Sequence, residues 1–210
     1  EGYIETKPLV YDNLVIFGAW DKNLYALDKK TGKEVWKWHE GKPGRFYSAA
    51  AVWPVAANGK VFITDPERAL TAIDASTGKT VWRTKESMVR ETVGLSEDKR
   101  RIYSKTMNDS VVCYSATTDF PEKIWASNVG FGYEHAPSMP VEKEGVVFGS
   151  TKNGLMFGLD AHTGKVLWKH KVGNSLISTL VPLSKNKCLF TATGGEIGLL
   201  VIDYKINKHK

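Results

Sequence analysis

A pattern of 13 residues recurs along this chain and restricts its fold more than any other feature. Each copy has a short apolar run that ends in Asp, a turn that reads Thr-Gly-Lys, and a second run that ends in Trp. Three close copies occupy residues 24–36, 70–82 and 156–168. A weaker copy leads from Val111 to Trp125, and a fifth begins at residue 199 and reaches Asp203. Repetition at this scale indicates an architecture assembled from similar units.

The repeated residues are those of a β-hairpin. The Asp can accept hydrogen bonds from backbone N–H groups of the turn, and the Gly can adopt a positive φ without strain. In the three close copies these residues are Asp28, Asp74 and Asp160, and Gly32, Gly78 and Gly164. Because the same turn recurs in each copy, we interpret its charged residues as structural and not as a site.

Two further segments precede each hairpin and complete a four-stranded unit. The nearer ones are apolar runs at residues 14–17, 60–63, 101–104, 145–148 and 188–191. Before them lie segments that end at Pro8, Pro54, Gly94, Pro140 and Pro182, which we expect to be the innermost strands. Successive Trp residues lie 46, 43 and 43 residues apart, at Trp36, Trp82, Trp125 and Trp168. That length suits one four-stranded blade of a β-propeller.

We therefore predict an all-β fold: a β-propeller of four-stranded antiparallel blades, with about five repeats in a single domain over residues 1–210. The expected blades are residues 1–38, 39–84, 85–127, 128–170 and 171–210. The spacing would place a fifth Trp at position 211, one past Lys210. We therefore expect an incomplete ring or part of a larger propeller, with more propeller or another domain upstream. An open edge of such a ring would be able to pair with another chain.

The units resemble the PQQ-type repeat of the quinoprotein-like propeller superfamily, in which a Leu-Tyr-Ala-Leu-Asp strand precedes a Thr-Gly-Lys turn and a Trp strand. The resemblance covers nearly the whole chain, and it extends to the non-catalytic propellers of the outer-membrane assembly lipoprotein type. It implies that each Trp packs between blades against a small residue two positions before the Asp. Those positions hold Ala26, Ala72, Cys113, Gly158 and Val201. The resemblance also implies an extracytoplasmic location, in the periplasm or cell envelope.

Cysteine, charge and hydropathy exclude several other classes of protein. Cys113 and Cys188 lie in predicted strands of different units and match no metal spacing, so we expect buried free thiols. The net charge of +6 is scattered, and only residues 99–101 cluster, so we expect no nucleic-acid binding. No stretch approaches the roughly 20 apolar residues of a membrane-spanning helix.

Catalytic signatures are absent from the sequence. There is no Gly-x-Ser-x-Gly, no His-Glu-x-x-His and no phosphate-binding loop. The dehydrogenases of the resembled superfamily use carboxylate and amide ligands, an Asp base and often vicinal cysteines, whereas this chain has no vicinal Cys pair and no Asp at an inner-strand start. We assign no catalytic, cofactor-binding or metal residues, and we expect no cofactor; PQQ with calcium is disfavoured.

The loops that lead into the innermost strands carry aromatic and charged residues of the kind found in protein interfaces. The candidate partner-binding residues are Arg45, Phe46, Tyr47, Arg90, Glu91, Tyr133, Glu134 and His135. We expect a non-catalytic scaffold that docks protein or other extended partners, in envelope assembly or as an accessory domain of a longer chain. The alternative is a fragment of a PQQ-dependent oxidoreductase, which a quinone absorption band in the purified protein would identify.

Overall fold

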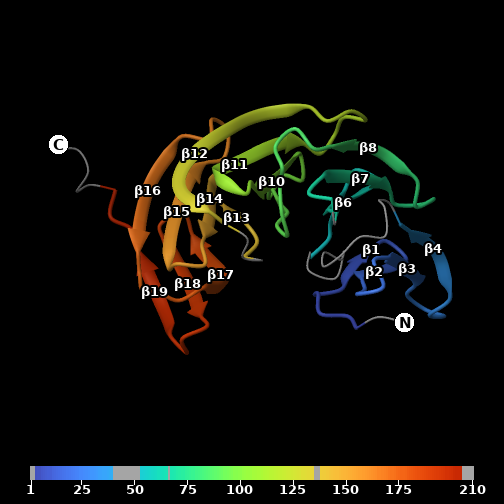
Figure 1. Cartoon of the computed structure of the whole chain (residues 1–210), viewed down its shortest axis with the longest axis horizontal. Helices are drawn as coiled ribbons and strands as arrows, with labels where there is room; N and C mark the ends of the chain where they lie inside the picture. Colours follow the sequence, from blue (N-terminus) through green and yellow to red (C-terminus); the bar gives the residue numbers. More distant parts are fainter. Residues whose placement is uncertain (1–2, 40–52, 66, 135–137, 205–210) are drawn as a thin grey trace.

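The computed structural model describes residues 3–39, 53–65, 67–134 and 138–204, and they form five antiparallel sheets that follow one another along the chain (Figure 1). The first two sheets are β1–β4 (Leu9–Tyr11, Leu14–Gly18, Leu24–Asp28, Glu34–Trp38) and β5–β8 (Val55–Ala57, Lys60–Thr64, Leu70–Asp74, Thr80–Thr84). The third and fourth are β9–β12 (Gly94–Leu95, Arg101–Lys105, Asn108–Ser115, Lys123–Tyr133) and β13–β16 (Val141–Lys143, Val146–Ser150, Leu155–Asp160, Val166–Lys171). The fifth has three strands, β17–β19 (Ile177–Ser184, Lys187–Ala192, Ile197–Val201).

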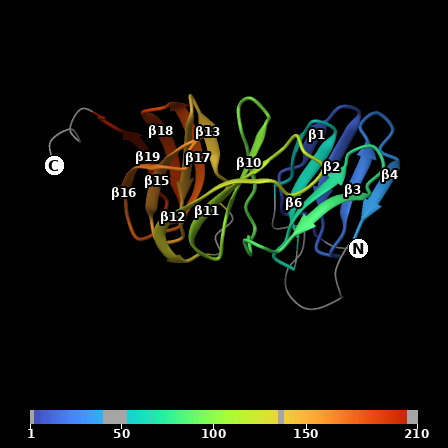
Figure 2. The same cartoon turned by 90° about the horizontal axis from the view of Figure 1, so that it is seen from above.

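The sheets are the blades of an open propeller. Successive innermost strands contact one another in the order β1, β5, β9, β13 and β17, so the sheets surround a common axis. They form an arc with sheet β1–β4 at one end and sheet β17–β19 at the other, and the arc does not close (Figures 1 and 2). The all-β propeller and its incomplete ring are therefore as predicted, and no helix occurs within the described residues.

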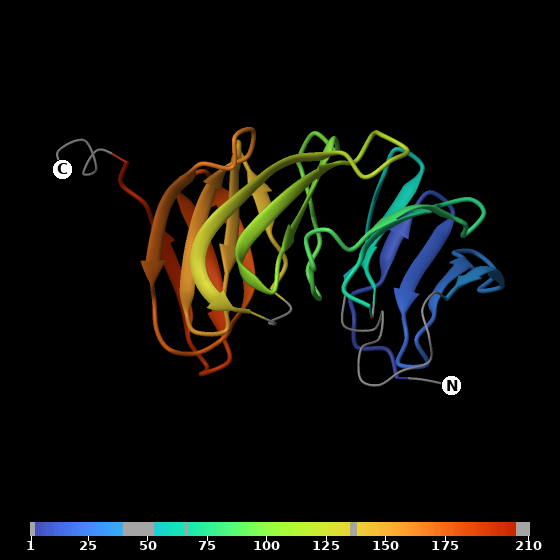
Figure 3. The ribbon, with the colours of Figure 1, turned by 45° about the horizontal axis from the view of Figure 1, so that its top comes forward.

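Two kinds of sequence-based boundary were wrong. Three innermost strands begin after Pro8, Pro54 and Pro140 rather than ending there, because a proline lacks the N–H that a strand pairs. The innermost strand of the third sheet begins at Gly94, and that of the fifth, β17, continues past Pro182 to Ser184. Strand β12 continues to Tyr133, past the expected blade end at residue 127. In Figure 3 it is the long curved strand on the outside of the third sheet. Its extension pairs with the start of β11, and Asn108 lies opposite Tyr133. Residues 131–133 are thus strand rather than loop.

The hairpin turn has the predicted construction. Oδ1 of Asp28 accepts hydrogen bonds from the backbone N–H groups of Lys30 and Thr31, at 3.0 and 2.8 Å. The contacts with Thr31 lower the pKa of the Asp28 carboxyl. Asp74 and Asp160 accept the same pair of backbone bonds in their own turns. The turn glycines have φ values near +70°, which explains why no residue with a β-carbon occupies these positions.

The hydrophobic core lies between the sheets, and a Trp lies at each of the four junctions. Trp36 of the first sheet is 7% exposed, and its Nε1 donates to the carbonyl of Ala75 in the second sheet at 2.8 Å. Its ring covers the turn glycine of that sheet: a β-carbon on Gly78 would lie 2.8 Å from the indole. Trp125 contacts Gly164 and the carbonyl of Ala161 in the same way. Trp36 and Trp125 therefore span from their own sheets to the turn of the next sheet.

The small residue two positions before the Asp packs against a Trp, as expected, and this Trp belongs to its own blade. Ala26 lies directly opposite Trp36 in the same sheet, and Ala72 lies opposite Trp82. Gly158 shows why the position must be small, because a β-carbon there would lie 2.2 Å from Nε1 of Trp168. The small residue thus makes room for the Trp of its own blade, and the neighbouring blade contributes the turn glycine.

The turn glycines provide a matched test of this packing. Gly32 and Gly78 have the same positive φ, but no atom lies within 4 Å of a β-carbon built on Gly32. We expect Gly32→Ala to lower the free energy of unfolding by about 1–2 kcal/mol, which is the cost of placing a residue with a β-carbon in the left-handed region. Gly78→Ala should cost clearly more, because Trp36 must also move. Urea denaturation measures both, and equal costs would contradict the contact.

Trp82 is 5% exposed and its ring stacks on Tyr114 of the third sheet, with centroids 6.3 Å apart. Trp82→Ala should lower the free energy of unfolding by about 3–5 kcal/mol, as expected for a large buried aromatic side chain. Thermal unfolding followed by circular dichroism measures the loss. A melting temperature within a degree or two of the parent's would show that Trp82 does not hold the second and third sheets together.

Candidate functional site

The candidate site is the face of the arc at which the chain runs into the innermost strands, and we call this face the mouth. Arg90 and Glu91 lie there in the loop between β8 and β9, and Tyr133 ends β12. Arg45, Phe46, Tyr47 and His135, which the sequence also predicted for this site, lie outside the described residues.

Three predicted residues are brought together at the mouth by chain segments far apart in sequence. Nε of Arg90 donates to Oε1 of Glu91 at 3.1 Å, and one terminal nitrogen of Arg90 lies 3.4 Å from the Tyr133 hydroxyl. Nζ of Lys152, from the β14–β15 turn, lies 5.0 Å from the centre of the Tyr133 ring. Tyr133 is nevertheless 50% exposed. It is an aromatic ring held between two cations and open to a partner.

The backbone around this cluster is unusual. Met88, Glu91 and Asp109 have φ values of 44°, 52° and 59°, a region that residues with a β-carbon seldom adopt. Met107 donates its backbone N–H to the carbonyl of Met88, and Gly132 donates to Oδ1 of Asp109 at 2.6 Å. The mouth loop of the third blade is therefore held in this conformation by its neighbours, although the same φ values also occur in turns away from the mouth, as at Asp12, Asn58 and Glu144.

Glu134 lies beneath the surface and not on it. It is 2% exposed, and its Oε2 accepts the backbone N–H of Lys152 at 3.0 Å. Its other oxygen lies 3.9 Å from Nζ of Lys105. Glu134 thus anchors the Lys152 turn next to Tyr133 and presents no atom for a partner to contact directly.

Lys105 is a buried cation that joins the third and fourth blades. It is 1% exposed, and its Nζ donates to Oγ of Ser138 at 2.7 Å and to the carbonyl of Ser150 at 2.8 Å. Burial lowers the pKa of Lys105 to about 8, against the opposing influence of Glu134 and Glu91. A buried ammonium with these partners fixes the two blades relative to one another below the mouth.

An apolar cavity of about 300 Å³ lies on the propeller axis. It is lined by the starts of four innermost strands, at residues 7–9, 53–55, 93–95 and 139–141. Strand β9 lies close to Pro140 there, because a β-carbon on Gly94 would lie 2.0 Å from the carbonyl oxygen of Pro140. Trp53 is 37% exposed at its edge, and Lys7 is the one charged side chain among the described residues that line it. These described residues can bind apolar groups but include no acid–base pair.

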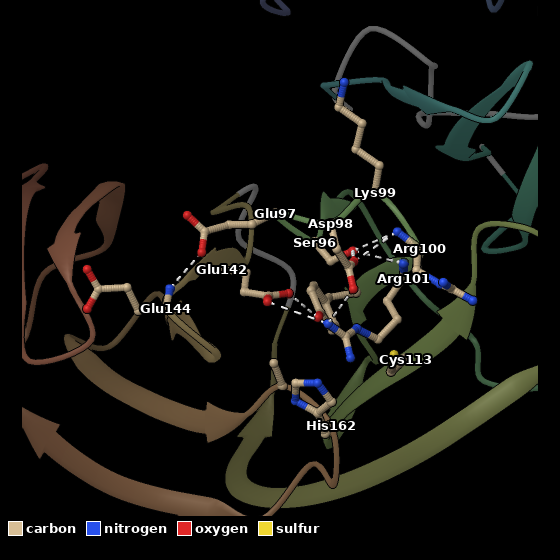
Figure 4. Close-up of polar contacts among 12 residues, drawn as sticks. Ser96, Glu97, Asp98, Lys99, Arg100, Arg101, Cys113, Glu142, Glu144 and His162 are labelled. Atoms are coloured by element: carbon tan, nitrogen blue, oxygen red, sulfur yellow. Dashed lines mark hydrogen bonds and ion pairs between the residues drawn. The ribbon is translucent and has the colours of Figure 1, made fainter.

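A second polar cluster connects the same two blades around the β9–β10 and β13–β14 turns, at the end opposite the mouth (Figure 4). The Tyr103 hydroxyl donates to Glu142, and a terminal nitrogen of Arg101 lies 3.6 Å from Glu142 and 3.2 Å from Asp98. Burial raises the pKa of Tyr103 above its ordinary value. Lys99 points away from this cluster in Figure 4. The carboxylates are already paired, so we assign this cluster a structural role.

Within the described residues, neither the cysteines nor any group of metal-ligating side chains forms a reactive centre. Cys113 and Cys188 are free and buried, as predicted. Burial raises the pKa of both thiols, to about 11 for Cys188, so neither is a thiolate at neutral pH. Among the described residues, no group of three or more His, Cys, Asp or Glu could hold a metal ion. The described part of the chain also has no helix of the length and hydropathy needed to cross a membrane.

Comparison with protein families identifies the repeat. The model described as "Outer membrane protein assembly factor BamB" matches residues 1–116 and again residues 108–206. Together the two matches cover nearly the whole chain. The chain belongs to the BamB family.

Solved structures support the same fold. A computationally designed protein, Ika8, superposes with a TM-score of 0.76 at 17% identity, over 93% of this chain and 57% of its own. BamB from Moraxella catarrhalis superposes with a TM-score of 0.61 at 15% identity, over 93% of this chain and 71% of its own. The chain therefore spans little more than half the length of the designed protein. No curated protein sequence matches it significantly.

Sequence reasoning missed several residues of the mouth in this BamB-family chain. Trp53 and Met139 each precede a proline that lies directly before an innermost strand, so X-Pro before a strand is a signal that could have found them. Lys105 and Lys152 carry no such signal. Lys105 ends an ordinary strand, and its burial depends on Ser138 and Ser150 of another blade.

Lys105 predicts a dependence of stability on pH. Its pKa of about 8 is below the ordinary value of 10.5, so between those values the unfolded chain binds more protons than the folded one. The free energy of unfolding should therefore rise with pH across this window, by up to about 3 kcal/mol from this group. Denaturation at pH 7.5 to 10.5 should show a steeper rise for the parent than for Lys105→Met. Parallel curves would contradict the lowered pKa.

Proposed function

We propose that this chain is a non-catalytic binding propeller that docks a protein partner through its mouth. In this proposal the chain takes part in outer-membrane protein assembly in the cell envelope, so its location is extracytoplasmic. The alternative is that it is an accessory part of a longer chain. The BamB-family repeat supports a binding role at the level of the family, and the geometry of the mouth supports the choice of face.

The observation that carries the proposal is the exposed Tyr133 ring held between Arg90 and Lys152. Tyr, Trp and Arg dominate the residues whose removal weakens protein complexes most. Tyr and Trp bury a large area with few rotatable bonds, and Arg offers five N–H donors. Trp53 and the apolar cavity lie on the same face and add a place for an apolar side chain of the partner. One propeller face can present the roughly 1,000 Å² that a stable complex requires.

A quinone-dependent oxidoreductase is the less favoured alternative. Calcium in such a site takes six to eight oxygen ligands, mostly from carboxylates and amides. The axial cavity has instead proline, valine and leucine in its lining, with an amine at Lys7 as the charged group. This donor set does not fit a calcium–quinone pair, so the proposal includes no cofactor.

Site-specific photo-crosslinking tests the proposal in the native envelope. A benzoylphenylalanine placed at Tyr133 or at Trp53 should form adducts with a protein of outer-membrane assembly. Phe120 is the matched control, because it is 60% exposed but lies in the β11–β12 connection at the opposite end of the blade. Adducts from position 120 alone, or the same adducts from all three positions, would place the partner elsewhere.

Substitution should give the corresponding loss of affinity. We expect Arg90→Ala and Tyr133→Ala each to weaken partner binding by about 30-fold or more, since such residues contribute about 2 kcal/mol or more each. Phe120→Ala should leave the affinity unchanged. Dye-linked dehydrogenase activity on addition of quinone and calcium would overturn the non-catalytic assignment.

A further inference from the structure

A groove of about 290 Å³ lies beside the mouth, between the β8–β9 loop and the strands β11 and β12. Met88 of the loop and Met107 and Asn108 of the third blade contribute to its lining. Met88 is 50% exposed, whereas Met107 is buried. Methionine side chains are flexible and polarizable, so they can pack against apolar side chains of different shapes. The groove can therefore accept an apolar side chain from outside.

Tyr133 connects this groove to Lys152. Across the β11–β12 pair, Tyr133 lies directly opposite Asn108, which lines the groove. The residue after it, Glu134, donates its backbone N–H to the carbonyl of Met107 at 3.0 Å. The Tyr133 ring in turn has Nζ of Lys152 at 5.0 Å from its centre. Groove, ring and ammonium thus form one continuous surface.

The acidic side chains described on this surface already have partners within the chain. Glu91 accepts a hydrogen bond from the neighbouring Arg90, and Asp109 accepts one from a backbone N–H of β12. At the wall of the groove, Glu86 pairs with Lys123. The carboxylates of this surface therefore balance charges next to themselves.

Lys152 differs from these residues. Its ammonium lies against the Tyr133 ring, and the described part of the chain gives it no carboxylate partner. Its position is nevertheless fixed, because its backbone N–H donates to Oε2 of Glu134, which is buried beside Lys105. Lys152 is also half-buried. A cation held in this way next to an exposed ring is stabilised by a carboxylate that a partner supplies.

We propose that the protein partner contributes an extended segment that places an acidic residue at Lys152 and, a few residues away, an apolar residue in the groove at Met88. An extended chain advances about 3.3 Å per residue, so it would cross Tyr133 and Asn108 in about three or four residues. A basic segment would be repelled by Lys152 and Arg90. This inference rests on the proposed function, because it gives the chemistry of the partner at the same mouth.

Carbodiimide coupling tests for the acidic residue. The reagent joins an amine to a carboxylate in contact with it as an amide and takes up the water as a urea. In the native envelope we expect Lys152 to be linked to an Asp or Glu of the protein that benzoylphenylalanine at position 133 crosslinks, as mass spectrometry would show. Lys152→Arg is the matched control, because a guanidinium keeps the charge but does not couple. It should lose this link and keep the photo-adduct at position 133.

Two further measurements locate the segment and its charge. Benzoylphenylalanine at position 88 should label the same partner within about four residues of the linked Asp or Glu. Lys152→Met should weaken partner binding about fivefold at low salt and less at high salt, whereas Lys152→Arg should bind like the parent.

The failure of this inference differs from the failure of the proposed function. A photo-adduct at position 133 without a carbodiimide link from Lys152 would overturn the inference and leave the proposed function standing. A link from Lys152 to a carboxylate of its own chain would also overturn it, because the ammonium would then be paired internally. Absence of the adduct at position 133 would refute the proposed function, and this inference with it.

Discussion

Burial of one Trp at each junction between blades is the interaction on which this structure depends. A blade of three or four short strands has two apolar faces and cannot bury both alone. At the first and third junctions, Trp36 and Trp125 cross to the next blade, cover its turn glycine and donate to the carbonyl of the residue that follows the turn Asp. The contact sets the distance between sheets, and its repetition produces the arc around a common axis (Figure 1).

This dependence explains what the sequence could and could not predict. The hairpin turns and their strands follow from local chemistry, so Asp28, Gly32 and Trp36 were sufficient to predict one blade, and the repeat predicted the others. The extension of β12 could not be predicted locally, because it rests on pairing with β11 and on Phe131 stacking against Phe157 of the fourth blade. Burial of Lys105 and Glu134 similarly requires partners from another blade, which a single unit does not reveal. The sequence therefore named Arg90 and Tyr133, which the structure brings together, but not the residues that support them; that they bind a partner stays a prediction.

Rigidity of the blades allows the mouth to carry function. The paired charges below it, Lys105 with Glu134 and Arg101 with Glu142, join the third and fourth blades at opposite ends of the same interface. Loops placed on such a support can hold strained conformations, and Met88 and Glu91 do so beside Tyr133. Recognition by a preformed surface loses less conformational entropy on binding than recognition by a mobile one. The fold thus supplies the pre-organisation that a docking surface needs.

A double-mutant cycle between Trp36 and Gly78 tests the central claim most directly. If the indole is what makes Gly78 intolerant of a β-carbon, Gly78→Ala should cost much less in a Trp36→Leu background than in the parent. In that background its cost should fall to that of Gly32→Ala in the parent, about 1–2 kcal/mol, giving a clear coupling energy between the two sites. Additive effects of the two substitutions on the free energy of unfolding would contradict the account, because they would show that the two residues do not act through one contact.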